Sequence, residues 1–198
     1  KRTQHSLSTW TIENERIEKL IQAPILVCTV DHLIPATEGV KGGKQIAPML
    51  RLLTSDLVID EPDDFGLEDL PALCRLVHWA GMLGSRVLLS TATMPPALTY
   101  AAFQAYQAGW SQYAKANLED WNGEITCAWF DENKTQDQQI SEFSAYEKAH
   151  QKFITERIKY LRSIERDKHL AEILPITKHI EKTVIQAVAE TLHSAALN

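Results

Sequence analysis

The sequence of 198 residues has few cysteines, no long apolar run and no excess of positive charge, and each absence excludes a class of protein. Its three cysteines cannot all pair and do not stand at metal-ligand spacing, which favours a reducing cytoplasm. No apolar run approaches the ~20 residues of a membrane span. The N-terminal residues lack the apolar segment of a signal peptide. The net charge of −6 argues against nucleic-acid binding through bulk positive charge, although it leaves room for a local basic groove.

Short apolar runs at residues 25–30, 56–60 and 86–90 are typical of strands buried on both faces. Between the second and third runs, apolar residues recur every three or four positions over residues 67–83, which predicts a helix that ends at Gly84. In a compact domain, strand, helix and strand imply parallel pairing with a right-handed crossover. The predicted fold class is therefore α/β with a parallel sheet.

The remaining chain is expected to be mostly helical, and we find no internal repeat. Two prolines open a helix that reaches about residue 117, since proline is tolerated in a first helical turn. The polar residues 131–139 indicate a boundary. The other expected elements are a helix before the first strand, a fourth strand, a charged helix and a last helix, at residues 14–21, 125–130, 140–166 and 176–192.

Acidic side chains follow the second predicted strand, where an open parallel sheet binds ligands. Asp60 and Glu61 stand in the arrangement that holds hydrated Mg²⁺ and polarises the water that attacks a γ-phosphate. Neighbouring side chains in extended backbone point to opposite sides, so Asp60 can hold the metal while Glu61 orients the water. The alternative is a solvated loop with a helix N-cap, which also uses acidic residues.

A hydroxyl cluster, Ser90, Thr91 and Thr93, ends the third predicted strand 30 positions after Asp60. Because one helix separates the two sites, the strand ends can lie side by side. These hydroxyls can then hydrogen-bond the acidic cluster and transmit a change there to a neighbouring surface. Thr93 can also cap the helix behind the two prolines, and both roles are compatible.

Weaker signals point to DNA-backbone contacts. Thr29 and Asp31 stand at the end of the first predicted strand, where they can meet a phosphate or simply cap a helical turn. Residues 39–45 do not form a phosphate loop, because the glycine spacing is one residue short and a glutamine follows the lysine. The sequence instead indicates a mobile loop in which Lys41 and Lys44 either touch a backbone phosphate or are simply solvated.

Three motifs in order, T-V-D-H-L at 29–33, D-E-P-D-D-F at 60–65 and S-T-A-T-M-P-P at 90–96, resemble those of the first RecA-like domain of superfamily 2 helicases. The longer stretches of sequence at residues 23–43 and 70–81 resemble a more specific family, the CRISPR-associated helicase-nuclease of type I-F systems. The resemblance covers residues 17 to about 130 well. It implies a parallel RecA-like sheet, the C-terminal half of the first motor domain, followed by a charged helical region.

The resemblance implies an ATP-dependent, Mg²⁺-dependent enzyme that a crRNA-guided surveillance complex recruits to invading DNA. Such an enzyme unwinds and translocates on single-stranded DNA and cuts it with separate nuclease metal ions, in a prokaryotic cytoplasm and in contact with CRISPR adaptation proteins. By position, the resemblance implies that Asp60 holds Mg²⁺ and that Glu61 orients the attacking water. Asp63 and the hydroxyl cluster become the coupling motif, and Thr29 with Asp31 a DNA contact.

The sequence departs from the family by having no phosphate loop, no HD nuclease motif and no arginine-bearing motif of the second RecA-like domain. We therefore expect an internal segment that is inactive alone. Its expected parts are residues 1–130 within the first motor domain, a helical insertion at 131–175 and a helix at 176–198 that leads toward the second. The alternatives are another DNA-translocating ATPase of superfamily 2 and a non-catalytic interaction module.

Overall fold

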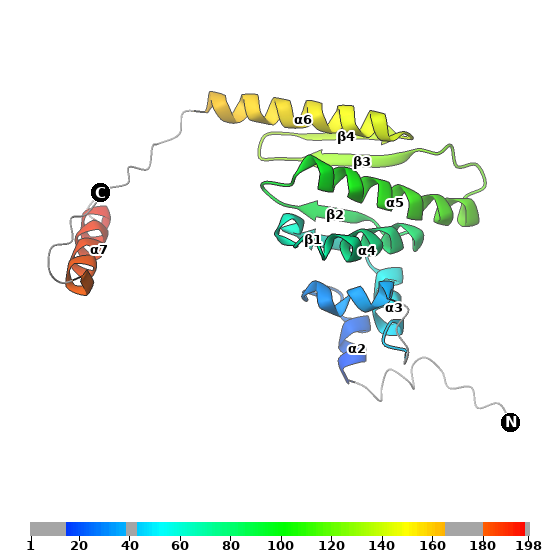
Figure 1. Ribbon diagram of the computed structural model, residues 1–198, viewed down its shortest axis with the longest axis horizontal. Coiled ribbons are helices and arrows are strands. Elements are labelled where there is room, and N and C mark those ends of the chain that lie inside the picture. The colour runs from blue at the N-terminus through cyan, green and yellow to red at the C-terminus, as the bar shows by residue number, and fades with distance from the viewer. Residues whose placement is uncertain (1–14, 39–42, 165–179, 197–198) are drawn as a thin grey trace. The chain divides into compact units, whose positions relative to one another are not determined.

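The computed structural model describes residues 15–38, 43–164 and 180–196 (Figure 1). Its contacts divide the chain into two units, Lys1–Lys159 and Tyr160–Asn198. Within the described ranges, none of the helices combines the length and the apolar character that a membrane crossing requires.

A parallel strand pair forms the centre of the first unit. Strands β1 (Leu57–Asp60) and β2 (Val87–Ser90) pair in parallel, with Leu57 opposite Val87 and Asp60 opposite Ser90. Helix α4 (Leu70–Met82) connects them. The predicted strand, helix and strand, with their parallel pairing, are confirmed.

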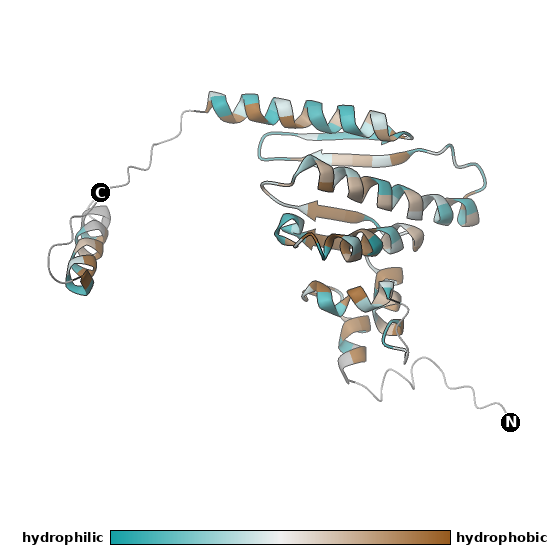
Figure 2. Ribbon diagram, in the orientation of Figure 1, coloured by the Kyte–Doolittle hydropathy of each residue, from teal (hydrophilic) through white to brown (hydrophobic). Residues whose placement is uncertain are grey.

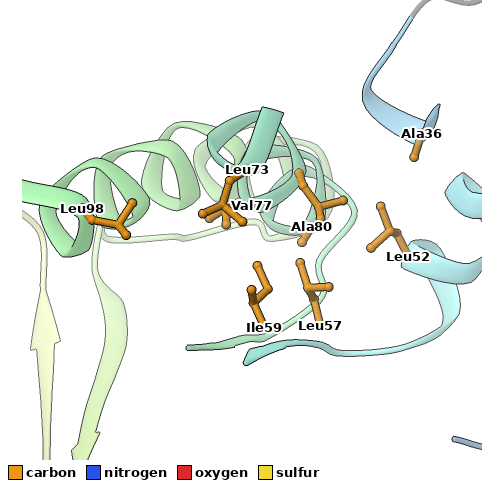
Figure 3. Packing of buried hydrophobic residues seen from close by; sticks show 9 residues of the cluster. Ala36, Leu52, Leu57, Ile59, Leu73, Val77, Ala80 and Leu98 are labelled. Atoms are coloured by element: carbon orange, nitrogen blue, oxygen red, sulfur yellow. The ribbon is translucent and has the colours of Figure 1, made fainter. Parts of the chain in front are cut away.

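Among the described residues, only one face of this sheet is covered. Leu57 and Ile59 are buried and point toward α4, as Figure 3 shows. Val58 and Leu88 keep 62% and 47% of their surface exposed. The aliphatic core is defined by nine buried residues: Ala36, Leu52, Leu57, Ile59, Leu73, Leu76, Val77, Ala80 and Leu98. The sheet therefore has a packed face and an open apolar face.

The prediction of a strand at residues 25–30 is wrong. Helix α2 (Glu15–Gln22) is followed by extended backbone that pairs with no strand in the described ranges, and the short 3-10 helices η1 (Val30–His32) and η2 (Ile34–Thr37) come next. Ile25 and Val27 are 83% and 93% exposed, so none of the described elements forms a layer over them. The structure thus shows a mixed α/β fold, and a complete RecA-like sheet stays a prediction.

Helices α3 (Ile46–Thr54) and α5 (Pro96–Asn117) complete this core. Helix α5, which begins at the predicted proline pair, crosses α4 at two glycines. A Cβ atom on Gly109 would lie 2.0 Å from the carbonyl oxygen of His78, and one on Gly81 would lie 2.7 Å from that of Tyr106. The two helices therefore approach backbone to backbone, which only glycine permits.

A hairpin and a long helix follow α5. Strand β3 (Ile125–Phe130) pairs antiparallel with β4 (Thr135–Ile140), and α6 (Phe143–Ser163) comes next. Asp131 Oδ1 closes the turn by accepting the N–H groups of Asn133 and Lys134, at 2.8 and 2.7 Å. The residues read as a polar boundary thus form a turn and most of β4. Its largely exposed, polar side chains carry almost no hydrophobic signal.

The hairpin and α6 build a second, aromatic core together with α5. It consists of Phe103, Trp129, Ile140, Tyr146, Ala149 and Phe153. In the second unit, α7 (Ile180–Ala196) matches the predicted last helix in part, whereas residues 176–179 lie outside the described ranges. Helix α7 exposes apolar side chains at Ile180, Val184, Ile185, Val188 and Leu192.

Candidate active site

The candidate active site lies where β1 and β2 end together. Asp60 and Ser90 are register partners at the last position of the two strands, and both are exposed. The sequence therefore brings a carboxylate and a hydroxyl-bearing residue to one edge of the sheet. Packed side chains do not seal this edge.

Glu61 leaves the strand in a left-handed conformation, with φ 46° and ψ 56°. Its N–H donates to the carbonyl oxygen of Ser90 at 2.7 Å, and its own carbonyl accepts the N–H of Asp64 at 3.1 Å. In the described part of the chain it is the one residue other than glycine with positive φ. Extended backbone ends at Asp60, so the expected alternation of side chains does not reach Glu61. Such strain in a non-glycine residue is typical of functional sites.

Asp63 joins the ends of the two strands through its carboxylate. Thr91 Oγ1 donates to Asp63 Oδ1 at 2.5 Å, and Thr93 Oγ1 donates to Asp63 Oδ2 at 2.6 Å. The N–H of Thr93 also donates to Thr91 Oγ1 at 3.2 Å. These hydrogen bonds, first from Thr91 and then from Thr93, lower the pKa of Asp63, because they favour the ionised carboxylate.

The alternative role of Thr93 as a helix cap is not what the structure shows. The residue at the N-cap of α5 is Pro95, and the Thr93 hydroxyl is used by Asp63. The acidic run is thus more than a solvated loop, since one of its carboxylates is tied to the hydroxyl cluster of the next strand. This link between the acidic and hydroxyl clusters is the geometry that the sequence led us to expect.

The donor set of this edge fits a hard divalent cation. Carboxylate and hydroxyl oxygens are the ligands that Mg²⁺ prefers, and Asp60 is exposed. No group of three or more His, Cys, Asp or Glu side chains in the described ranges could hold a metal ion by itself. Mg²⁺ is commonly held by one or two carboxylates with water and substrate phosphates, so the residues fit that mode rather than a protein cage.

The predicted DNA contacts lie elsewhere. Thr29 and Asp31 are exposed at the start of η1, and the Thr29 side chain makes no capping hydrogen bond. Lys44 is exposed in the turn before α3, and Lys41 lies outside the described residues.

Sequence reasoning missed the backbone of Glu61. Pro62 gives no signal of it, because a proline fixes its own φ and restricts the residue before it to extended backbone rather than to the left-handed region. Pro62 is among the most deeply buried side chains and opens a 3-10 turn that carries Asp63 and Asp64. The burial of that proline, which the sequence does not disclose, anchors the acidic turn against the core.

No family model matches the chain. It is 49% identical over 193 residues to the CRISPR-associated nuclease/helicase Cas3 subtype I-F/YPEST of Pectobacterium atrosepticum, a match that covers 94% of the chain. It is 50% identical over 159 residues, 80% of the chain, to the protein of the same name from Pseudomonas aeruginosa. The chain is similar to one segment of these Cas3 subtype I-F proteins.

The similarity to the Cas3 subtype I-F proteins extends over a small part of their length. The chain spans 17% of the first relative and 15% of the second. It therefore matches one segment of much longer proteins, and this segment contains the strand-end cluster of Asp60, Glu61, Asp63, Thr91 and Thr93. The type I-F resemblance seen in the sequence motifs is confirmed.

Proposed function

We propose that this chain supplies part of the ATP-hydrolysing motor of a DNA helicase-nuclease in type I-F CRISPR interference. The observation that carries the proposal is the Asp63 carboxylate, which holds the hydroxyls of Thr91 and Thr93 at the end of the neighbouring strand. The names of both relatives, nuclease/helicase, agree with it. They do not favour an unrelated DNA translocase or a non-catalytic module.

Each residue of the strand-end site has a separate task in this mechanism. Bound Mg²⁺ would neutralise the charge that develops on the transferring phosphoryl group of ATP. Asp60 would hold this ion through a water molecule, and Glu61 would position the attacking water. Asp63, with Ser90, Thr91 and Thr93, would report hydrolysis to the next surface of the protein, because its hydrogen bonds join the two strand ends.

Other components of the activity would come from outside this chain. The sequence has no phosphate loop, so the 198 residues alone should bind ATP negligibly. Each missing charge-assisted contact is worth about 1.5–3 kcal/mol.

We propose that Thr29, Asp31, Lys41 and Lys44 touch single-stranded DNA. The crRNA-guided complex, the CRISPR adaptation proteins and the nuclease metal ions would be engaged by the longer protein, in a prokaryotic cytoplasm.

The test is Glu61→Gln in the full-length protein that carries this chain. ATP turnover should fall about 100-fold or more, since a positioned base contributes roughly 10²–10⁴-fold, while ATP affinity stays within about twofold. Steady-state hydrolysis and equilibrium binding of a fluorescent ATP analogue measure the two quantities. Glu68→Gln, which changes an exposed glutamate seven residues away, is the matched control and should leave both unchanged. Normal turnover in Glu61→Gln would remove Glu61 from this role.

A further inference from the structure

Helix α6 has a core face and an opposite, basic face. Tyr146, Ala149, His150 and Phe153 are buried in the aromatic core. On the other side, Lys148, Lys152 and Lys159 are exposed and stand four and seven residues apart. At about 100° per residue, these three lysines fall within an arc of about 40°. We call them the basic stripe, and Figure 2 shows hydrophilic residues along much of α6.

Within the described ranges, no ion pair within 4 Å involves a lysine of the basic stripe. Two acidic groups near the stripe are in contact with other cations. Lys134 Nζ contacts Glu156, and Arg157 contacts Glu132 at 3.3 Å. The pKa of Glu156 is lowered, first by its hydrogen bond from Lys134 and also by the positive charges of Lys134, Lys152 and Lys159.

The side chains that flank the basic stripe are mostly polar and uncharged. Ser144, Gln151 and Thr155 lie on the same side of α6 and are exposed. Glu147 is also exposed, about 100° around the helix from Lys148. A row of cations bordered by hydroxyl and amide groups suits an extended polyanion, since those groups also hydrogen-bond phosphate oxygens.

We propose that the basic stripe binds the phosphodiester backbone of a single DNA strand, at a site separate from the strand ends of β1 and β2. The lysines are spaced by about 6 and 10 Å along the helix axis, which lets one strand meet all three. Lysine binds phosphate as a flexible point charge, so we expect no sequence preference. The choice of DNA over another polyanion rests on the proposed function.

The experiment measures binding of fluorescein-labelled oligothymidylate to the full-length protein without nucleotide, over a range of salt concentrations. The variant Lys148→Gln/Lys152→Gln/Lys159→Gln should bind about tenfold more weakly at low salt. The slope of log K against log salt should become shallower by about 2, because each single-strand phosphate contact contributes about 0.7. Arg75→Gln/Lys115→Gln/Lys182→Gln removes the same charge from exposed positions on other helices and should keep the wild-type affinity and slope.

Three results would overturn the proposal. The first is an unchanged DNA affinity and salt slope in the stripe variant, and the second is an equal loss of affinity in both triple variants. The third is a stripe variant that loses binding to polyglutamate, a different polyanion, but retains its affinity for DNA. Far-UV circular dichroism and the unfolding midpoint establish that α6 still folds in the stripe variant. Basal ATP hydrolysis without DNA separates this proposal from the motor. Normal turnover in Glu61→Gln would refute the motor alone, whereas stripe-independent DNA affinity in an active ATPase would refute the stripe alone.

Discussion

The aliphatic core around β1, β2 and α4 differs from the aromatic core around the hairpin and α6, although both use α5. Leu98 of α5 belongs to the first and Phe103 to the second. The aliphatic core leaves one sheet face open and carries the polar strand-end site at its edge. In the aromatic core, Phe103 stacks on Tyr146 with ring centroids 4.1 Å apart.

The two cores also treat polar groups differently. The carboxylates and hydroxyls of the strand-end site are exposed or half-buried, so they can meet a ligand. In the aromatic core the buried polar side chain is His150, whose Nδ1 accepts the indole N–H of Trp129 at 3.2 Å. The first core thus carries the candidate site at its edge, while the second supports helix α6, which carries the basic stripe.

The largest expected effect comes from Gly109→Ala, which tests whether α5 is held to the aliphatic core by close contact. The added Cβ would lie 2.0 Å from the carbonyl oxygen of His78, so the helices must separate. We expect a loss of about 3 kcal/mol in the free energy of unfolding, at the upper end for overpacking. Urea denaturation followed by circular dichroism measures it.

Gly66→Ala is the control for this substitution. Its Cβ would meet nothing closer than 3.6 Å, so the unfolding free energy should change by less than about 1 kcal/mol. Equal effects of the two substitutions would mean that the approach of α4 and α5 is not the source of the loss.

The sequence predicted the parts of the fold that have a strong local signal. The apolar periodicity of α4 and the proline pair before α5 gave both helices, and two short apolar runs gave β1 and β2. A similar run at residues 25–30 led to the wrong prediction of a strand. A continuous apolar run forms a strand only if other strands and layers surround it. Strand β4 was missed for the opposite reason, since its polar side chains depend on β3 for their conformation.

The candidate site was predictable as a set of residues and less so as a geometry. The order of the motifs placed Asp60 opposite Ser90, because parallel strands end at the same edge. The hydrogen bonds from Thr91 and Thr93 to Asp63 follow from that arrangement. The left-handed backbone of Glu61 could not be read from the sequence, since it depends on how the acidic turn packs.

A smaller effect tests whether the strand-end site of the aliphatic core stores strain. A left-handed conformation costs a non-glycine residue roughly 1–2 kcal/mol, which glycine avoids. Glu61→Gly should therefore raise the free energy of unfolding by about 1 kcal/mol, while Glu61→Gln leaves it unchanged and Glu61→Val lowers it. Thermal unfolding of the three variants measures the order. Stability that does not follow this order would show that the backbone of Glu61 is unstrained.

The smallest expected effect concerns the aromatic core and its buried histidine. Burial lowers the pKa of His150, because the charged imidazolium would lose its hydration. The unfolded chain then takes up a proton near the ordinary histidine pKa of about 6.5, whereas the folded chain does so at lower pH. Folding is thus penalised as the pH falls from about 7 through this interval. His150→Gln can still accept the indole N–H of Trp129, but its side chain does not titrate. The wild type therefore loses stability at low pH that the variant does not lose. The deficit of the variant in unfolding free energy, relative to wild type, should shrink as the pH falls from 7.5 to 5. A constant deficit, measured by urea denaturation at several pH values, would show that the aromatic core tolerates the charge and would remove this contrast with the strand-end site.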